Sequence, residues 1–172
     1  MLRFLQWVEA LGFSTWVRES GSIWSYPLIL FLHTVGLGFL VGPSVAIGVR
    51  LLGIGKALPL PPMKRLYPLM WMGFWINAIS GFILLMADAT TKLTNWDFYV
   101  KLVFIGFAVW AQQLIRKRVF DEGDEQDLIV VPRTTRYLTI VMLVCWTFAI
   151  TAGRLMAYLG PVSGAPNLTN KF

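Results

Sequence analysis

Four apolar runs divide this chain of 172 residues, and each run of roughly 20 residues is long enough to cross the hydrocarbon core of a bilayer as a helix. They lie at about 25–49, 67–86, 98–115 and 137–159. Because 56% of the residues are hydrophobic and only 14% are charged, one soluble core cannot bury all the apolar side chains. The sequence therefore predicts an all-α integral membrane protein, a four-helix bundle of antiparallel neighbours surrounded by lipid.

Residues 1–24 precede the first run and mix apolar with charged side chains. This pattern predicts an N-terminal amphipathic helix that lies in the membrane interface. Gln6 and Glu9 interrupt what would be the apolar centre of a signal peptide, so we favour the interfacial helix. After the fourth run comes Gly160-Pro161, and we expect 160–172 to form a disordered tail.

The distribution of Lys and Arg predicts the orientation. The loops after the first and third runs hold nine of the 15 such residues, and the opposite side holds six. Since basic loops stay in the cytoplasm, we expect a multi-pass protein of a bacterial inner membrane with both termini in the periplasm. The net charge of +6 lies mainly in short loops, without a basic helix or an aromatic RNA-binding motif, so we expect no nucleic-acid partner.

Small residues recur every four positions in three of the runs, which lets another helix backbone approach closely. We expect these positions to pack helices within the chain or against other membrane subunits or a second copy. Asn77 can add an interhelical hydrogen bond. The packing positions are Gly38 and Gly42 in the first run, with Thr34 and Ala46; Gly73, Asn77 and Gly81 in the second; and Gly153 in the fourth, with Ala149 and Ala157.

His33 is the only histidine, and it lies about 10 Å below the outer membrane boundary if its helix begins near residue 25. An imidazole at that depth can ligate haem b iron or copper, and Gly36, one turn on, would leave room for a flat macrocycle. Met86 and Met156 lie on the same side and offer thioether ligands, although methionine also fills gaps. The alternative is a neutral histidine that is hydrogen-bonded to a neighbouring helix.

Two cations lie at membrane depth, Lys101 in the third run and Arg154 in the fourth. Such charges are costly in hydrocarbon unless they reach the interface or find a partner. They could bind haem propionates, an anionic lipid head group or a quinone carbonyl, or they could pair with Asp88 or Asp97. Because the helices alternate in direction, we expect His33 and Met86 to share one depth with these two cations, in a candidate site near the outer face.

Four stretches, WVRES (16–20), YPLILFLHTVGLGFLVGPSVAIGVRLLG (26–53), NWDFYVK (95–101) and AGRLMAY (152–158), resemble a family of small bacterial inner-membrane proteins of unknown function. The first helix, with its histidine and glycines, is more distantly similar to CopD-type copper-resistance membrane proteins. The resemblance implies a four-span bundle with an N-terminal interfacial helix. This chain departs from the family at Gly48, where an acidic residue is usual. The family pattern singles out Trp16, Arg18, His33, Arg50, Asn95, Phe98, Lys101, Gly153 and Arg154.

Three functions remain open from the sequence. The favoured one is a non-catalytic subunit or scaffold of a membrane complex. The second is a haem or copper protein with His33 as a ligand, and the third is a small transporter or lipid-binding protein that uses Asn77, Lys101 and Arg154. An enzyme is less expected, because no nucleophile, paired carboxylates or metal-ligand motif has a plausible spacing.

Overall fold

The computed structural model describes residues 2–55, 57–123 and 131–159, with the backbone alone described for residues 2 and 156–159. Throughout these ranges the chain forms helices and turns and no strand. Four helices are long and apolar enough to cross a membrane. The all-α fold class and the four-helix membrane bundle are thus confirmed, and the expected tail at 160–172 lies outside the described residues.

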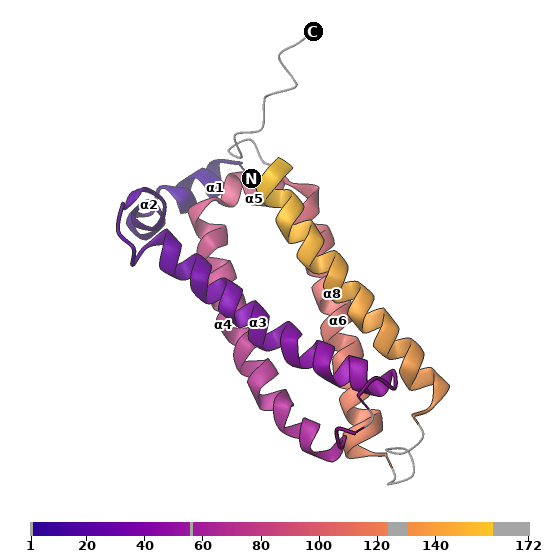
Figure 1. The fold of residues 1–172 in the computed structure, drawn as a ribbon. Helices are drawn as coiled ribbons and strands as arrows, with labels where there is room; N and C mark the ends of the chain where they lie inside the picture. Colours follow the sequence, from indigo (N-terminus) through magenta and orange to yellow (C-terminus); the bar gives the residue numbers. More distant parts are fainter. Residues whose placement is uncertain (1, 56, 124–130, 160–172) are drawn as a thin grey trace.

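The four long helices are α3 (Tyr26–Leu51), α4 (Leu66–Ala87), α6 (Trp96–Ile115) and α8 (Arg133–Leu159). Proline in the first turn of α3 needs no amide partner, and at the start of α6 the side chain of Asn95 accepts a 2.9 Å hydrogen bond from the Asp97 amide. As Figure 1 shows, α3 lies along α4 and α6 lies along α8, in two antiparallel pairs. The molecule is therefore built from two helix pairs.

The pairs meet at one end of the bundle, where the loops after α3 and α6 lie. A buried cluster there joins all four helices, among them Ile47, Tyr67, Ile115 and Met142. In α6, all of which is described, no residue before Ala108 is buried. We call this closed end the loop half. The opposite end contains the starts of α3 and α6, and we call it the terminal half. Figure 1 shows the two pairs diverging toward the terminal half.

Two glycines bring α3 and α4 together. A Cβ atom on Gly36 would lie 2.7 Å from the Asn77 amide nitrogen, and one on Gly73 would lie 2.7 Å from the Leu40 amide nitrogen. No side chain fits at such distances, so the two backbones touch. The space that we expected beside Gly36 for a macrocycle is filled by α4, which corrects that prediction.

The N-terminal segment forms two helices where we expected one. Helix α1 (Leu2–Glu9) and helix α2 (Gly12–Glu19) are separated by Ala10 and Leu11, and Leu11 is extended. The break lets α2 dock, because Val17 is fully buried against Ile29 and other residues of α3 and α4. Short helix α5 (Ala89–Thr94) lies beside α1. There the Glu9 carboxylate accepts a 2.5 Å hydrogen bond from the Thr90 amide.

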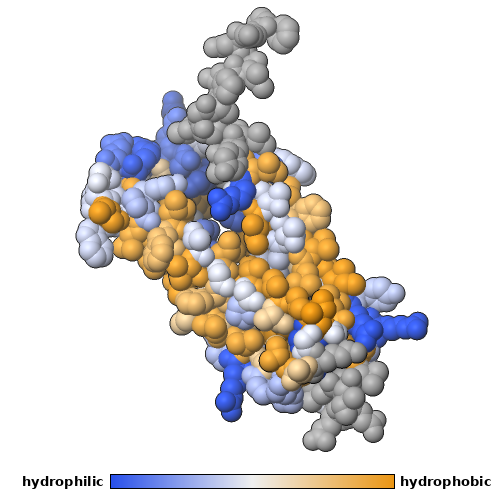
Figure 2. Space-filling view, in the orientation of Figure 1, coloured by the Kyte–Doolittle hydropathy of each residue, from blue (hydrophilic) through white to orange (hydrophobic). Residues whose placement is uncertain are grey.

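Each of the two N-terminal helices carries a pair of exposed aromatic side chains. Phe4 and Trp7 have ring centroids 6.0 Å apart, and Phe13 and Trp16 have centroids 6.3 Å apart. All four rings are largely exposed. Figure 2 shows a broad apolar surface over the middle of the bundle, with hydrophilic residues gathered toward its two ends. This arrangement suits a bundle whose middle is embedded in lipid.

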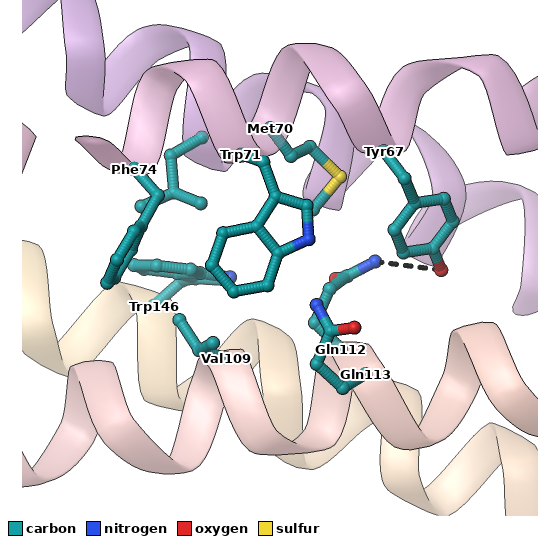
Figure 3. A pocket seen from close by; sticks show the side chains of 9 residues that line it. Tyr67, Met70, Trp71, Phe74, Val109, Gln112, Gln113 and Trp146 are labelled. Atoms are coloured by element: carbon teal, nitrogen blue, oxygen red, sulfur yellow. Dashed lines mark hydrogen bonds between the residues drawn. The ribbon is translucent and has the colours of Figure 1, made fainter. Parts of the chain in front are cut away.

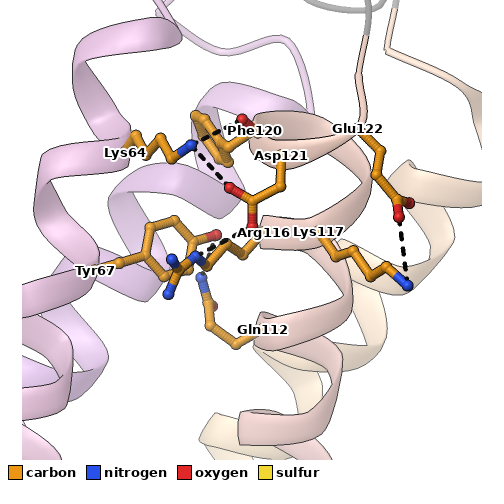
Figure 4. Close-up of polar contacts among 8 residues, drawn as sticks. All are labelled: Lys64, Tyr67, Gln112, Arg116, Lys117, Phe120, Asp121 and Glu122. Carbon is orange, nitrogen blue, oxygen red and sulfur yellow. Dashed lines mark hydrogen bonds and ion pairs between the residues drawn. The ribbon is translucent and has the colours of Figure 1, made fainter.

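At the loop end, the segment Arg116–Asp121 continues α6 as a single stretch of π-helix, η2, and is not the solvated loop that the sequence suggested. Val119 of this segment packs into the buried cluster, and Asp121 lies 2.8 Å from Lys64 Nζ and 3.4 Å from Arg116 Nε (Figure 4). Lys64 itself belongs to the 3-10 helix η1 (Pro61–Arg65) that leads into α4. The loop end is thus tied across α4 and α6 by charges at the surface.

Candidate functional site

His33 on α3 is held in one orientation by α4. Its Nδ1 lies 3.0 Å from the Asn77 carbonyl oxygen and 3.1 Å from Ser80 Oγ. Because a carbonyl only accepts, Nδ1 carries a proton, and in the neutral ring the lone pair lies on Nε2. In return, the Asn77 side chain donates a 2.8 Å hydrogen bond to the His33 carbonyl. The imidazole is half-buried, and among the described residues Nε2 has no hydrogen-bond partner.

Gly81 and Gly153, which we expected to pack helices, lie against basic side chains. A Cβ atom on Gly81 would lie 2.9 Å from Cε1 of His33, so only glycine accommodates the ring in this position. A Cβ atom on Gly153 of α8 would lie 3.5 Å from Nζ and Cε of Lys101. The lysine side chain therefore runs from α6 across the face of α8.

Lys101 is half-buried within the helices of the terminal half. It lies within electrostatic reach of His33. In the described part of the chain it forms neither a hydrogen bond nor an ion pair, so it pairs with neither Asp88 nor Asp97. Burying an ammonium group in this setting without a counter-ion costs free energy.

Lys92 on α5 adds a third basic group, which the sequence analysis did not single out as a site residue. Its ammonium donates a 2.6 Å hydrogen bond to the Leu84 carbonyl near the end of α4. Burial lowers the pKa of Lys92, while the charge of Asp88 raises it and that of Lys101 lowers it. Lys92 is also within electrostatic reach of His33. The terminal half thus gathers three basic groups from α3, α5 and α6.

The remaining predicted ligands do not all join this cluster. Met86 is nine residues from Asn77, which is half a turn around α4, so it lies on the face opposite the one that holds His33. Arg154 follows Gly153 on α8 and is exposed. The side chain of Met156 lies outside the described residues. The structure therefore brings together His33, Lys92 and Lys101.

The predicted stripe on α3 faces away from the bundle. A Cβ atom on Gly38 or Gly42 would meet no atom within 4 Å, and Thr34 and Ala46 are exposed as well. The packing face of α3 instead contains Gly36, two residues from Gly38 and about 200° around the helix. Packing of the exposed stripe against another chain stays a prediction.

The other family-pattern residues lie at helix ends. Trp16 and Arg18 are exposed on α2, and a hydrogen bond to Glu19, at 2.9 Å, raises the pKa of Arg18. Arg50 near the end of α3 donates a 2.5 Å hydrogen bond from Nε to the Leu58 carbonyl. Phe98 is half-buried in the first turn of α6, which Asn95 caps. Apart from His33, Lys101 and Gly153, these positions stand outside the basic cluster.

A second polar group, in the loop half, was missed by the sequence reasoning. Gln112 on α6 donates a 3.1 Å hydrogen bond from Nε2 to the hydroxyl of Tyr67 on α4, and Trp146 of α8 lines the same small pocket (Figure 3). The available signal was a glutamine inside an apolar run, a residue type that is costly in lipid.

Comparison with protein-family models, with curated proteins and with solved structures gives no match to this chain. Its function must therefore be argued from the site itself, and the resemblance to a bacterial inner-membrane family stays a prediction.

The basic cluster is suited to an anion. Among the described residues, no group of three or more His, Cys, Asp or Glu side chains could hold a metal ion. A copper ion on Nε2 of His33 would also face the positive charges of Lys92 and Lys101, which oppose its binding. A carboxylate or phosphate group, in contrast, would be attracted by both ammonium groups and could accept their hydrogen bonds.

Proposed function

We propose that this small integral membrane protein binds an anionic amphiphile in its terminal half, with Lys101 as the principal contact and with Lys92 and His33 beside it. The observation that supports this proposal best is the half-buried Lys101 ammonium, which has no carboxylate partner among the described residues. An intramembrane charge without a partner is costly in free energy, and an anionic head group would supply that partner. The acyl or ring portion of the ligand would remain in the apolar bundle or the surrounding lipid.

Thermal unfolding in mild detergent tests the proposal. We expect phosphatidylglycerol, at about 100 times its Kd, to stabilise the wild-type protein by about 2.7 kcal/mol, or roughly 5 to 10 °C. Phosphatidylcholine should have no comparable effect. Lys101→Arg should respond like the wild type, whereas Lys101→Met should lose the shift.

The matched control is Lys117→Met, which removes an exposed lysine at the opposite end of the bundle, where it pairs with Glu122 at 3.4 Å. This variant should respond to phosphatidylglycerol like the wild type. Equal shifts for wild type and Lys101→Met would contradict the proposal.

Haem b is an alternative anionic ligand for the same site. Its propionates are anionic, and Nε2 of His33, which has no hydrogen-bond partner among the described residues, could ligate its iron. The hydrogen bond from Nδ1 to the Asn77 carbonyl is the type that orients metal-bound histidines. Absorption spectra of oxidised and dithionite-reduced protein separate the two ligands. A Soret band that disappears in His33→Ala would identify haem, and a colourless protein would leave a lipid as the ligand.

We propose a second candidate function, membership of a larger assembly. The exposed stripe of small residues on α3 supports it. Close helix association needs small residues on a lipid-facing surface, and Gly38 and Gly42 provide them. If a second copy binds there, Gly42→Leu should abolish co-purification of two differently tagged copies. Gly106→Leu on α6, which also points into open space, is the control. Unchanged co-purification in Gly42→Leu would argue against self-association through this face.

For localisation, we propose the bacterial inner membrane with the terminal half on the periplasmic side. The support is the excess of Lys and Arg in the loops at the loop end. Labelling of single cysteines on intact cells, after Cys145 is replaced, would test this orientation. A cysteine at Gly21 should react with an impermeant reagent and one at Arg118 should not.

A further inference from the structure

A small pocket in the loop half contains two buried polar atoms without partners. It is lined by residues of α3, α4, α6 and α8 and has an internal volume of about 10 Å³. Gln112 and Trp146, which line it, are each 2% exposed. Among the described residues, neither the Oε1 atom of Gln112 nor the Nε1 atom of Trp146 has a hydrogen-bond partner. Buried polar atoms are normally satisfied, so these two indicate a bound group.

The two unpartnered atoms define the chemistry of that group. In the structure Nε2 of Gln112 donates to the Tyr67 hydroxyl, and Oε1 is left as an acceptor. The indole Nε1 of Trp146 can only donate. One atom that donates to Gln112 and accepts from Trp146 satisfies both, and a hydroxyl oxygen does this. The internal volume is about that of one such oxygen.

The surroundings of the pocket favour a hydroxyl that arrives from the membrane. The remaining lining is mostly apolar, and Trp71 stands in front of the pocket, partly exposed, as Figure 3 shows. Nearby on α4 and α6, Trp75 and Trp110 are more than half exposed on the bundle surface. Helices α4 and α6 belong to different pairs, so the seam between them is only lightly packed. A molecule that enters here comes from lipid.

We propose that this pocket binds the hydroxyl group of a membrane-soluble alcohol, such as a long-chain or isoprenoid alcohol, whose hydrocarbon chain lies in the seam between α4 and α6. The hydroxyl donates to Gln112 Oε1 and accepts from Trp146 Nε1. This site is separate from the basic cluster in the terminal half and does not depend on the function proposed for it. The same hydrogen bonds can be made by a single water molecule, which the test distinguishes.

The test is photolabelling of the full chain in mild detergent. The probe is a long-chain primary alcohol with a diazirine close to its hydroxyl end, and the matched probe is the diazirine alkane without the hydroxyl. We expect saturable labelling by the alcohol on the pocket residues of α4 and α6, mapped by mass spectrometry of peptides. Excess dodecanol should compete with this labelling, and dodecane should not.

Variants connect the labelling to the two unpartnered atoms. Gln112→Leu removes the acceptor, together with the hydrogen bond to Tyr67, and Trp146→Phe removes the donor, together with one ring of the indole. Each variant should reduce labelling at least fivefold. Trp110→Phe changes an exposed tryptophan that does not line the pocket and should leave labelling unchanged. The competition arm needs no variant, so it stands even if a substitution impairs folding.

Two results would overturn the proposal. Equal labelling by the alcohol and the alkane would show that the hydroxyl is not recognised. A lack of saturable labelling, with dodecanol unable to compete, would mean that the pocket holds water only.

Discussion

The two halves of the bundle use the same four helices in different ways. In the loop half, side chains from all four helices close into one apolar cluster, in which Ile47 and Met142 are fully buried. In the terminal half, the pairs diverge (Figure 1). His33 and Lys101 are half-buried there. One half therefore supplies tight apolar packing and the other contains half-buried cations, because tight apolar packing and a desolvated cation exclude each other.

The largest expected effect is on packing in the closed half. Ile47→Ala removes a fully buried side chain from the cluster and should lower the free energy of unfolding by about 2 to 5 kcal/mol. Leu102→Ala, at a 48% exposed position in the terminal half of α6, should change it by less than about 0.5 kcal/mol. Chemical denaturation in detergent measures both, and similar losses for the two variants would remove the distinction between the halves.

The next effect has the opposite sign. In lipid-free detergent, Lys101→Met should raise the free energy of unfolding by about 1 to 2 kcal/mol, because an ammonium group without a carboxylate partner gives way to an apolar chain. Phosphatidylglycerol should then reverse the order of wild type and variant. A loss of stability in Lys101→Met without lipid would mean that the lysine is structurally satisfied.

A smaller effect separates two glycines of the terminal half. Gly81→Ala places a methyl group 2.9 Å from the His33 ring and should break its hydrogen bond to Asn77, at a cost of about 1 kcal/mol. Gly153→Ala makes ordinary contact with Lys101 at 3.5 Å and should be neutral. Because His33 is the only histidine, nitrogen NMR reads its tautomer directly. An unchanged His33 spectrum in Gly81→Ala would contradict the packing described here.

The smallest effect concerns the surface of the closed half. Asp121→Asn weakens the ion pairs with Lys64 and Arg116, and since these groups are substantially exposed, we expect a loss below about 1 kcal/mol that vanishes in high salt. Thermal unfolding at two salt concentrations measures it. A larger, salt-independent loss would show that η2 holds the loop end together in another way.

The sequence predicts the fold well, because hydropathy and length suffice to identify four membrane helices. It assigns the glycines poorly. Spacing predicts Gly38, Gly73 and Gly81 as packing positions, and Gly36 is predicted only as space beside His33. The packing of α3 on α4 shows that Gly36 and Gly73 touch backbones, that Gly81 lies against the His33 ring and that Gly38 faces outward. A periodic pattern shows which residues share a face of a helix, but it does not show what packs against that face.

The candidate site was predictable in part for the same reason. The sequence indicates His33 and Lys101 as site residues because they are polar groups in apolar runs. In the structure they lie within electrostatic reach of each other. Lys92 was not predicted as a site residue, because it belongs to a short helix after α4. Its side chain turns back to the Leu84 carbonyl. Met86 is predicted from its thioether group and its depth, whereas its angular position on α4 places it on the other side of the helix.

The most direct test of a binding site in the terminal half is the native mass spectrum of the protein as purified in mild detergent. We expect wild-type protein and Lys101→Arg to carry one anionic amphiphile per chain, and Lys101→Met to be bare. A bare wild-type chain, or the same adduct on all three proteins, would contradict the proposal that the half-buried lysine holds an anion.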